Sequence, residues 1–444
     1  MKTGFSKVCI NPPYGAPMVG YYEARFVKGI EQNLYARAVA FDDGCKKAVV
    51  IAVDVIGLTL DFCNMAKDAI AASTGIEKDA IFINFSHTHT GPLVGEDFAS
   101  ETKSSDAYND FLITGIRDAA IYALDDLCES RFEVGDAEAK NISFIRRYRM
   151  KDGGVVTNPG AYNENIDHPL GTPDETVKLV KIVRDGSDDI FIINFGTHAD
   201  AVGGEYINSD YMGYACSTLE KAIPGINCIF LLGPQGDVNH ININPTKGEW
   251  NILEDKEAVC PHSVRHSQHM GRVIAGAVLS VCSVTEEINA DRISYGVKEV
   301  QLPSYRENDK LDEARRIWTL HESGKDDELP YKGMELTTVI AEAKRIVGLE
   351  NGPESFPFLI SALRIGELVF AGIGGEPFTE IGVRISDASP FKNTIVCCLT
   401  NNSGSYIPTK SAYDEGGYEA RASVLMPGGD DIIVEGVVEL LKTL

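Results

Sequence analysis

Short apolar runs rich in valine and isoleucine recur along this chain of 444 residues and alternate with stretches of helical periodicity. The apolar runs have strand length, and several end in glycine or polar residues. The alternation predicts an α/β fold with central mixed β-sheets and helices on the outside. Strands are predicted at Tyr35–Phe41, Lys47–Ile56, Ala80–Phe85, Thr176–Arg184, Asp189–Phe195, Ile226–Leu232, Leu359–Ile373 (a hairpin turning at Gly366) and Thr394–Leu399. Helices are predicted at Leu60–Ser73, Asp106–Cys128, Tyr211–Ile223, His262–Val281, Lys310–Ser323 and Met334–Val347.

The length of the chain is compatible with one large domain or with two or three ordinary ones. The sequence contains no repeat and no low-complexity linker, so we expect a single domain over residues 1–444. One compositional shift stands out, the charged helical segment Arg306–Pro353. We interpret this segment as a solvated helical excursion, with a lid or a small subdomain as alternatives.

The charge balance excludes several classes of partner. Lys plus Arg number 41 and Asp plus Glu number 65, which gives a formal net charge of −24. Such a chain would be repelled by nucleic acid and by anionic membranes. The sequence shows no secretory signal and no apolar run of transmembrane length, and its ten cysteines lack C-x-x-C pairing. We therefore expect a cytoplasmic protein with reduced thiols and a small-molecule substrate, and the oligomeric state is left open.

The segment Ile83–Gly91 carries two histidines, His87 and His89, directly after the apolar run Ala80–Phe85. On extended backbone, residues two apart point to the same face, so the two imidazoles are expected to lie side by side. Paired imidazoles at a strand end are a candidate half of a metal site. Two hydrogen-bonded histidines at a loop entrance would explain the segment equally well.

Further candidate ligands follow other predicted strands. His198 comes after Ile190–Phe195, in the same position relative to its strand as His87. Glu376 follows an apolar strand that ends in two glycines, and the turn Gly233–His240 gathers Asp, Asn and His after a buried strand. Functional sites collect at the carboxyl ends of strands in sheets flanked by helices. Taken singly, each of these residues also fits a structural histidine, a surface glutamate or an ordinary polar turn.

A rival cluster lies on one predicted helix. His262, His266 and His269 are spaced i, i+4 and i+7 and therefore share a helix face. Arg265 and Arg272 flank them, and no carboxylate on that face balances the charge. We therefore favour a solvated or helix-packing face over a metal site.

The strand-end motifs, taken in order, resemble the neutral/alkaline non-lysosomal ceramidase superfamily over nearly the whole chain. The matching motifs are Ile10-Asn11-Pro12-Pro13-Tyr14-Gly15, Met18-Val19-Gly20-Tyr21, Leu34-Tyr35-Ala36-Arg37, Ser86-His87-Thr88-His89-Thr90-Gly91-Pro92, His198 with Ser209-Asp210, Gly236-Asp237-Val238, Gly375-Glu376-Pro377-Phe378, and Tyr406-Ile407-Pro408-Thr409 with Tyr413 and Tyr418. Each motif is modest by itself, but their shared order makes the resemblance strong. It implies a fold like the ceramidase catalytic domain.

The resemblance also implies a metal centre with one zinc ion. The ligands carried over from the family are His87, His198, Glu376 and Tyr413. Tyr406 and Tyr418 lie close to Tyr413 in sequence and are alternatives for the tyrosine ligand. His89 would face the reacting carbonyl, and the family's arginine falls at Arg146 or Arg147. Arg146 or Arg147 would bind a carboxylate or another anionic group of the substrate, and a salt-bridged strand end explains the double arginine equally well.

The sequence departs from the family in two respects. Ceramidases carry a serine two residues after Gly-Asp, where this chain has Asn239, and we expect their C-terminal β-rich domain to be missing, since the sequence ends at Leu444. We therefore expect a short, distant member that acts on a more polar substrate than ceramide. Asn239 would bind substrate, and His240 with Asp237 would manage the proton of the leaving amine. Tyr413 would share with His89 the stabilisation of the oxyanion.

Three functions are compatible with this sequence. The leading hypothesis is a zinc-dependent hydrolase that cleaves a linear amide bond of a small, fairly polar N-acyl substrate with metal-activated water. The second keeps the metal but acts on an ester, a lactone or a sugar-derived substrate. The third is a ligand-binding member of the family without catalysis. The presence of all four candidate ligands argues against the third.

Overall fold

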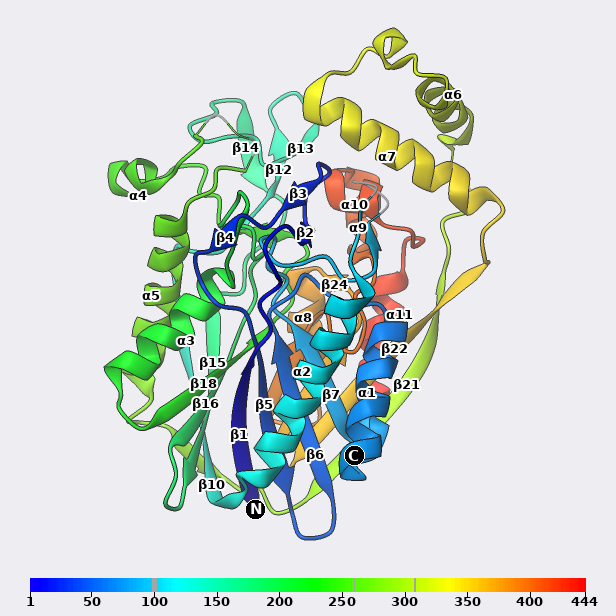
Figure 1. Cartoon of the computed structure of the whole chain (residues 1–444). Helices are drawn as coiled ribbons and strands as arrows, with labels where there is room; N and C mark the ends of the chain where they lie inside the picture. The colour runs from blue at the N-terminus through cyan, green and yellow to red at the C-terminus, as the bar shows by residue number, and fades with distance from the viewer. Residues whose placement is uncertain (98–101, 257, 259, 307–308) are drawn as a thin grey trace.

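The computed structural model describes residues 1–97, 102–256, 258, 260–306 and 309–444. Within these residues the main element is a nine-stranded mixed sheet (Figure 1). The spatial order is β18 (Ile226–Leu232), β16 (Asp189–Phe195), β15 (Thr176–Arg184), β10 (Cys128–Glu138), β1 (Lys2–Cys9), β5 (Tyr35–Asp42), β6 (Lys47–Val53) and β7 (Ile81–Phe85), and β20 (Glu286–Ile288) pairs with β10. The mixed sheet with outer helices confirms the predicted fold class.

A smaller sheet packs against the large one. It contains β21 (Ile293–Pro303), β22 (Ser355–Ile365), β23 (Leu368–Ile373) and β25 (Asn393–Cys397), in that order. Successive residues of β23 point to opposite faces. Leu368 and Phe370 join the core of the large sheet, and Val369 and Ala371 join a second core with the helices behind. The smaller sheet therefore lies between the large sheet and two helices, α8 (Thr379–Ala388) and α11 (Gly429–Leu441).

Helices cover the sheets on their outer sides (Figure 1). The described helices are α1 (Leu60–Thr74), α2 (Asp106–Asp125), α3 (Asp210–Ala222), α4 (Lys247–Ile252), α5 (Val264–Val281), α6 (Leu311–Glu322), α7 (Gly333–Glu350), α8 (Thr379–Ala388), α9 (Lys410–Glu415), α10 (Tyr418–Ala422) and α11 (Gly429–Leu441). Helix α2 packs on β1 and β5. Helices α3 and α5 pack against each other and contact β18, β10 and β15 of the large sheet. Helix α11 packs on β21 and β22. None of the described helices combines the length and apolar composition needed to cross a bilayer.

The charged segment predicted as an excursion forms the helical hairpin of α6 and α7, which projects from the molecule (Figure 1). Residues 307 and 308 of that segment lie outside the described residues. The hairpin leaves and rejoins the smaller sheet at neighbouring positions, because Pro303 pairs with Ser355 and the Ser304 N–H donates to the Glu354 carbonyl at 2.9 Å. Its two helices share a small core of their own that includes Ile317. This geometry is that of an insertion into a β-hairpin.

Short strand pairs organise the loops at one end of the sheets. They are β2 (Pro17–Met18) with β3 (Arg25–Phe26), β4 (Gly29–Ile30) with β17 (Tyr206–Ile207), β8 (Glu96–Asp97) with β9 (Thr102–Lys103), β11 (Phe144–Ile145) with β19 (Val238–Asn239), β12 (Arg147–Met150) with β13 (Val155–Thr157) and β14 (Ile166–Pro169), and β24 (Glu376–Pro377) with β26 (Tyr406–Ile407). Two of these pairs, β11 with β19 and β24 with β26, position residues of the candidate site.

Two buried asparagines tie together the strand ends that carry the candidate ligands. The Asn84 side chain accepts from the Leu232 N–H at 2.7 Å and donates to the Cys398 carbonyl at 2.6 Å. Asn194 donates to the carbonyls of Leu231 at 3.0 Å and Val396 at 3.3 Å. The carboxyl ends of β7, β16, β18 and β25 therefore meet at one place, as expected for a site at the edge of such sheets.

Candidate metal centre

The two histidines of the opening motif lie on a turn and not on an extended strand. Strand β7 ends at Phe85, and His87 adopts a left-handed backbone conformation with φ of 60°. The prediction of extended backbone through both histidines was therefore wrong. The rings nevertheless meet edge to face with centroids 5.0 Å apart. Left-handed backbone is costly for a residue other than glycine and is found most often where function requires it.

Hydrogen bonds fix the tautomers of His87 and His89. The Nδ1 atom of His87 lies 2.8 Å from the Ile56 carbonyl, and Nδ1 of His89 lies 2.8 Å from the Gly20 carbonyl. A carbonyl oxygen only accepts, so each Nδ1 carries a proton and donates it. In the neutral rings, both Nε2 atoms therefore carry no proton. An imidazole binds a metal through such an unprotonated nitrogen.

Three further side-chain atoms approach the His87 Nε2 atom. The Nε2 of His198 lies 3.2 Å from it, that of His89 lies 3.4 Å away, and the Oε2 of Glu376 also lies 3.4 Å away. A proton on the His198 Nε2 atom could form a hydrogen bond in only one of these three contacts. A divalent cation bound by His87, His198 and Glu376 would remove the need for such a proton and would leave the His89 Nε2 atom beside it.

The separations match the size of a zinc site. Zinc binds histidine nitrogen at about 2.0–2.1 Å in tetrahedral geometry, which places neighbouring ligand atoms about 3.3–3.4 Å apart. The observed separations of 3.2 to 3.4 Å fall at this value. The donor set of imidazoles with one carboxylate is also one that zinc prefers. The residues present therefore fit the metal that the sequence implied.

Burial keeps the imidazoles in the neutral form that binds metal. Burial and the adjacent His87 lower the pKa of His89 to about 3. Burial and the nearby Arg146 guanidinium hold the pKa of His198 well below its usual range. Both rings are therefore uncharged at neutral pH, and neither has to lose a proton when a cation binds.

Three tyrosines are candidates for the position beside this centre. The register of the β24–β26 pair favours Tyr406. Strand β24 pairs in parallel with β26, and Glu376 is directly opposite Tyr406. The Tyr406 ring stacks on His198 with centroids 6.5 Å apart. Tyr413, the ligand expected from the sequence, instead bonds the Ser423 hydroxyl at 3.0 Å and contacts the Tyr305 ring. Tyr418 packs edge-on against Tyr406 at 5.9 Å.

Of the two candidate arginines, only Arg146 contacts this group of residues. Its Nη2 donates to the Tyr406 hydroxyl at 3.1 Å and to the Gly236 carbonyl at 2.8 Å, and its Nε donates to the fully buried Glu419 at 2.6 Å. Arg147 donates to Glu415 at 3.0 Å and therefore serves the alternative role of a salt-bridged strand end. Glu419 was not identified from the sequence, because its partner lies 273 positions away.

The contact expected between Asp237 and His240 is not formed. Asp237 Oδ1 accepts from the Thr379 N–H at 2.7 Å and its hydroxyl at 2.9 Å. The His240 ring contacts Asp200 Oδ1 at 3.0 Å through Nδ1 and the Pro261 carbonyl at 2.8 Å through Nε2. With both nitrogens occupied and the ring buried, His240 has no atom free for a substrate proton.

The Asn239 side chain is also bound within the protein. Its amide nitrogen donates to Asn158 at 3.0 Å, and its oxygen accepts from the Ile241 N–H at 3.1 Å. Because Asn239 is fully buried, these bonds shape the loop after β19.

The rival histidine cluster is divided between different contacts. His262 Nε2 lies 2.5 Å from the Tyr21 hydroxyl, whereas the His266 ring lies 5.2 Å from His240 and 6.3 Å from His269. Among the described residues, these three histidines therefore form no common group of ligand atoms. Tyr21, which also meets the His89 ring edge-on at 6.0 Å, connects His262 to the surroundings of His89.

Glycine 20 permits the close approach that supports His89. Its φ is +109°, and a Cβ built at this position would lie 3.0 Å from the Cα, Cβ and Cγ atoms of His89. The Arg25 guanidinium stacks on Tyr21 and donates to the His89 carbonyl at 2.7 Å. The segment around Gly20 therefore fixes both the backbone and the ring of His89. The sequence offered only the Gly-Tyr motif as a signal for this role.

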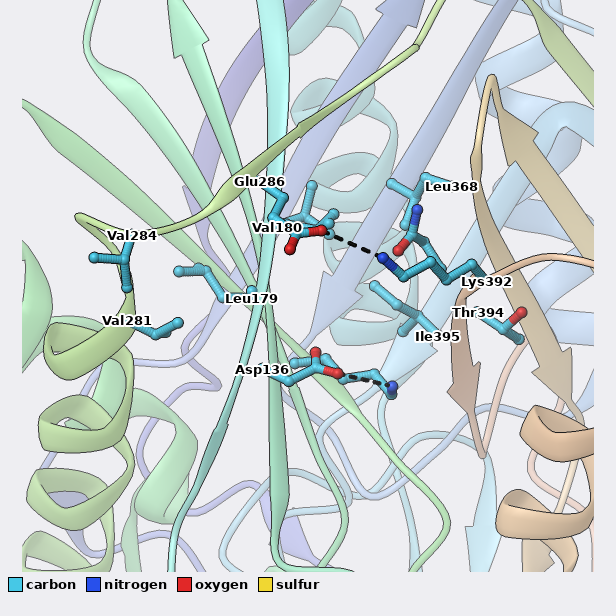
Figure 2. Close-up of a pocket in the computed structure, with 14 residues that line it drawn as sticks. Asp136, Leu179, Val180, Val281, Val284, Glu286, Leu368, Lys392, Thr394 and Ile395 are labelled. Carbon is cyan, nitrogen blue, oxygen red and sulfur yellow. Dashed lines mark hydrogen bonds and ion pairs between the residues drawn. The ribbon is translucent and has the colours of Figure 1, made fainter.

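A groove of about 340 Å³ lies elsewhere, between the two sheets (Figure 2). Val180, Leu368 and Ile395 supply apolar lining, and ion pairs join Glu286 to Lys392 at 3.3 Å and Asp136 to Lys178 at 3.7 Å. None of the histidines lines it. Its charged groups are paired with one another, so it offers no set of converging reactive groups.

Comparison with solved structures identifies the fold. The chain superposes on the crystal structure of neutral ceramidase from Pseudomonas aeruginosa with a TM-score of 0.74 and 18% identity, covering 100% of this chain and 75% of that one. A structure described as ceramidase complexed with C2 gives a TM-score of 0.72 at 17% identity, with the same coverage. No family model matches the sequence. The expected ceramidase-like fold is therefore confirmed over the whole chain.

Proposed function

We propose that this ceramidase-like chain is a metal-dependent hydrolase, and that it cleaves the amide bond of a small, fairly polar N-acyl substrate. The observation that carries the proposal is the approach of two imidazole Nε2 atoms, those of His198 and His89, and of the Glu376 carboxylate to the His87 Nε2 atom, at 3.2 to 3.4 Å. We assign His87, His198 and Glu376 as ligands of one zinc ion, with Tyr406 in place of Tyr413 as the neighbouring tyrosine. The bound ion would polarise the scissile carbonyl and lower the pKa of a neighbouring water toward about 7.

His89 is the group we assign to orienting the attacking water. Its Nδ1–H donates to the Gly20 carbonyl, so its Nε2 presents a lone pair to the centre. Since the low pKa of His89 makes the ring a weak base, Nε2 accepts a hydrogen bond from the water rather than its proton. The role differs from the hydrogen-bond donor expected from the sequence, because a donor would need the proton on Nε2.

Tyr406 is the group we assign to the developing oxyanion. Arg146 Nη2 donates to the Tyr406 oxygen, which leaves the phenol's own proton for a substrate oxygen. Burial and the nearby Glu376 carboxylate hold the pKa of Tyr406 well above its usual range, so the phenol keeps this proton. A fixed donor aimed at the oxyanion stabilises the transition state without rearrangement.

Polar aromatic residues near the centre support a substrate of moderate polarity. Tyr21 meets the His89 ring edge-on at 6.0 Å, and the hydroxyls of Tyr22 and Tyr418 lie 3.3 Å apart. Such side chains combine an apolar face with a hydrogen-bonding end. They suit an acyl chain that carries polar groups better than a long saturated one.

A substrate panel on metal-free and zinc-loaded protein tests the proposal. We expect the zinc-loaded protein to hydrolyse short N-acyl amides, and we expect His198→Asn to lose both the ion and the activity. Turnover of esters or lactones without amides would reassign the bond that is cleaved. Retention of zinc without turnover of any of these substrates would favour the non-catalytic alternative.

A further inference from the structure

A second group of metal-binding side chains lies close to the candidate centre but does not belong to it. Asp200, His240 and Cys260 each offer one ligand atom, and these atoms all lie within 4.8 Å of one another. Asp200 follows His198 by two residues, His240 follows β19, and Cys260 precedes α5. Three segments distant in sequence therefore bring a carboxylate, an imidazole and a thiol together.

The carboxylate of Asp200 lies between the other two donors. Its Oδ1 is 3.0 Å from the His240 Nδ1, and its Oδ2 is 3.4 Å from the Cys260 Sγ. Zinc binds oxygen and nitrogen at about 2.0–2.2 Å and thiolate sulfur at about 2.3 Å, which places such donors about 3.3–3.6 Å apart. Only small side-chain movements separate this arrangement from a coordination shell.

The second ring nitrogen of His240 is oriented as in a metal ligand. Nε2 lies 2.8 Å from the Pro261 carbonyl and must donate to it. Metal-binding histidines usually hold their outer N–H in this way, which directs the other nitrogen to the ion. The contact between Nδ1 and the Asp200 carboxylate at 3.0 Å is held by a proton, and a metal ion can take the place of that proton.

An adjacent histidine supplies an independent sign of a missing partner. His266 is only 5% exposed, and neither of its ring nitrogens has a hydrogen-bond partner. Its ring centroid is 5.2 Å from that of His240. Buried polar atoms of this kind are rare in folded proteins unless an ion or a water satisfies them.

We propose that Asp200, His240 and Cys260 form a second site for a divalent cation of the zinc type, with His266 as an additional donor. Thiolate and imidazole select zinc and similar metals over calcium and magnesium. One ion would replace two protons, one between His240 and Asp200 and one on the Cys260 thiol, so the net charge of the buried group stays unchanged. The ion would tie the loop before α5 to the strand end that carries His198.

Cobalt(II) substitution tests this site without an activity assay. Under anaerobic conditions, we expect the metal-free protein to bind two Co²⁺ ions per chain, one of them with a thiolate-to-cobalt absorption band. Cys260→Ser should bind one ion and lack the band, whereas Cys45→Ser, a change at an exposed cysteine, should keep both. His87→Asn should lose the other ion and keep the band, which separates this proposal from the proposed function.

The absence of a thiolate band in the unmodified protein, or its persistence in Cys260→Ser, would overturn the proposal. Proton release gives a second measurement that needs no variant at this site. Titration of His87→Asn with Co²⁺ in buffers of different ionisation enthalpy should show about two protons released for the bound ion, because metal displaces protons from its ligands. Release of no protons would also overturn the proposal.

Discussion

The identity of the tyrosine beside the metal centre is decided by one backbone pairing. Tyr406 is directly opposite Glu376 in the pair of β24 with β26, and Arg146 donates to its hydroxyl. We expect Tyr406→Phe to lower kcat by about 100-fold, the usual effect of losing one oxyanion donor. Tyr413→Phe is the matched control and should change kcat by less than about 3-fold, because its hydroxyl bonds Ser423 instead.

Steady-state kinetics of both variants against one N-acyl substrate would measure this difference. Equal losses in the two variants, or a larger loss in Tyr413→Phe, would return the role to Tyr413.

The support of His89 by Gly20 can be separated from simple backbone strain. Gly20 and Gly15 both have positive φ, +109° and +80°, but a Cβ would contact His89 only from Gly20 and would meet nothing within 4 Å from Gly15. Both alanine variants should be destabilised by about 1 kcal/mol from the left-handed backbone. Only Gly20→Ala should also reduce kcat, by about 10- to 100-fold, because a small misplacement of a reacting group is costly.

Thermal unfolding with kinetics on the same samples would check this pair of variants. If the two variants lose activity in proportion to their loss of stability, Gly20 has no separate positioning role.

Single residues show where reasoning from the sequence succeeds and where it fails. The segments that carry His87, His198 and Glu376 could be identified because each follows a predicted strand. The partner of His240 could not, since Asp200 lies 40 positions earlier and only the folded loops bring them together. The sequence could not decide among Tyr406, Tyr413 and Tyr418, because spacing does not reveal the register of a two-residue strand pair.

At the scale of elements, Asn84 joins the carboxyl ends of β7, β18 and β25 next to the site. Asn84→Leu would leave the Leu232 N–H buried without a partner and would remove one of the two donors to the Cys398 carbonyl, which still accepts from Thr400. A buried unpaired N–H costs about 1–3 kcal/mol and a lost hydrogen bond about 0.5–1.5 kcal/mol, so we expect a total of about 2–4 kcal/mol. Ile83→Val, a change in the same buried strand, should cost only about 0.5–1.5 kcal/mol.

Urea-induced unfolding with constant slope would give both values. Similar costs for the two variants would show that the asparagine bonds do not hold the strand ends together.

The docking of α7 on α10 should depend on pH. Glu342 pairs with Arg421 at 2.7 Å and Lys310 at 3.2 Å. Burial alone would raise the pKa of Glu342, but hydrogen bonds and charge from Arg421 and Lys310 outweigh burial and lower it. A lowered folded pKa contributes stability above the ordinary glutamate pKa of about 4.3, and that stability is lost as the pH falls through the lower folded value.

We therefore expect hydrogen exchange in α7, corrected for its intrinsic pH dependence, to accelerate below about pH 4. Glu342→Gln should exchange faster at neutral pH and show no such step. A step of equal size in Glu342→Gln would assign the pH dependence to another group.

Some strands could be predicted from their own sequences and others could not. Strands β15, β16 and β18 match their predicted bounds, because β16 and β18 are continuous apolar runs and β15 alternates apolar with polar residues. Strands β1, β10 and β21 were missed, since charged and apolar residues mix along them; β10, for example, reads Cys-Glu-Ser-Arg-Phe-Glu-Val-Gly-Asp-Ala-Glu. Such strands are half-exposed, so their pairing partners define them more than their own composition does.

For the whole molecule, the large sheet, the smaller sheet and the helices behind it bring distant segments to one edge. The predicted mixture of strands and helices was sufficient for the fold class, but not for the order of strands, which depends on pairings between residues far apart in the chain. The helical hairpin of α6 and α7 interrupts a single β-hairpin between Pro303 and Ser355. The site is therefore a product of the whole fold, since its ligands follow β7, β16 and β23.

Anomalous scattering from crystals of the zinc-loaded protein, measured on both sides of the zinc absorption edge, tests the central claim most directly. The account predicts a peak about 2.0–2.2 Å from the Nε2 atoms of His87 and His198 and from the Glu376 carboxylate. The absence of any peak within coordination distance of these three side chains would contradict it.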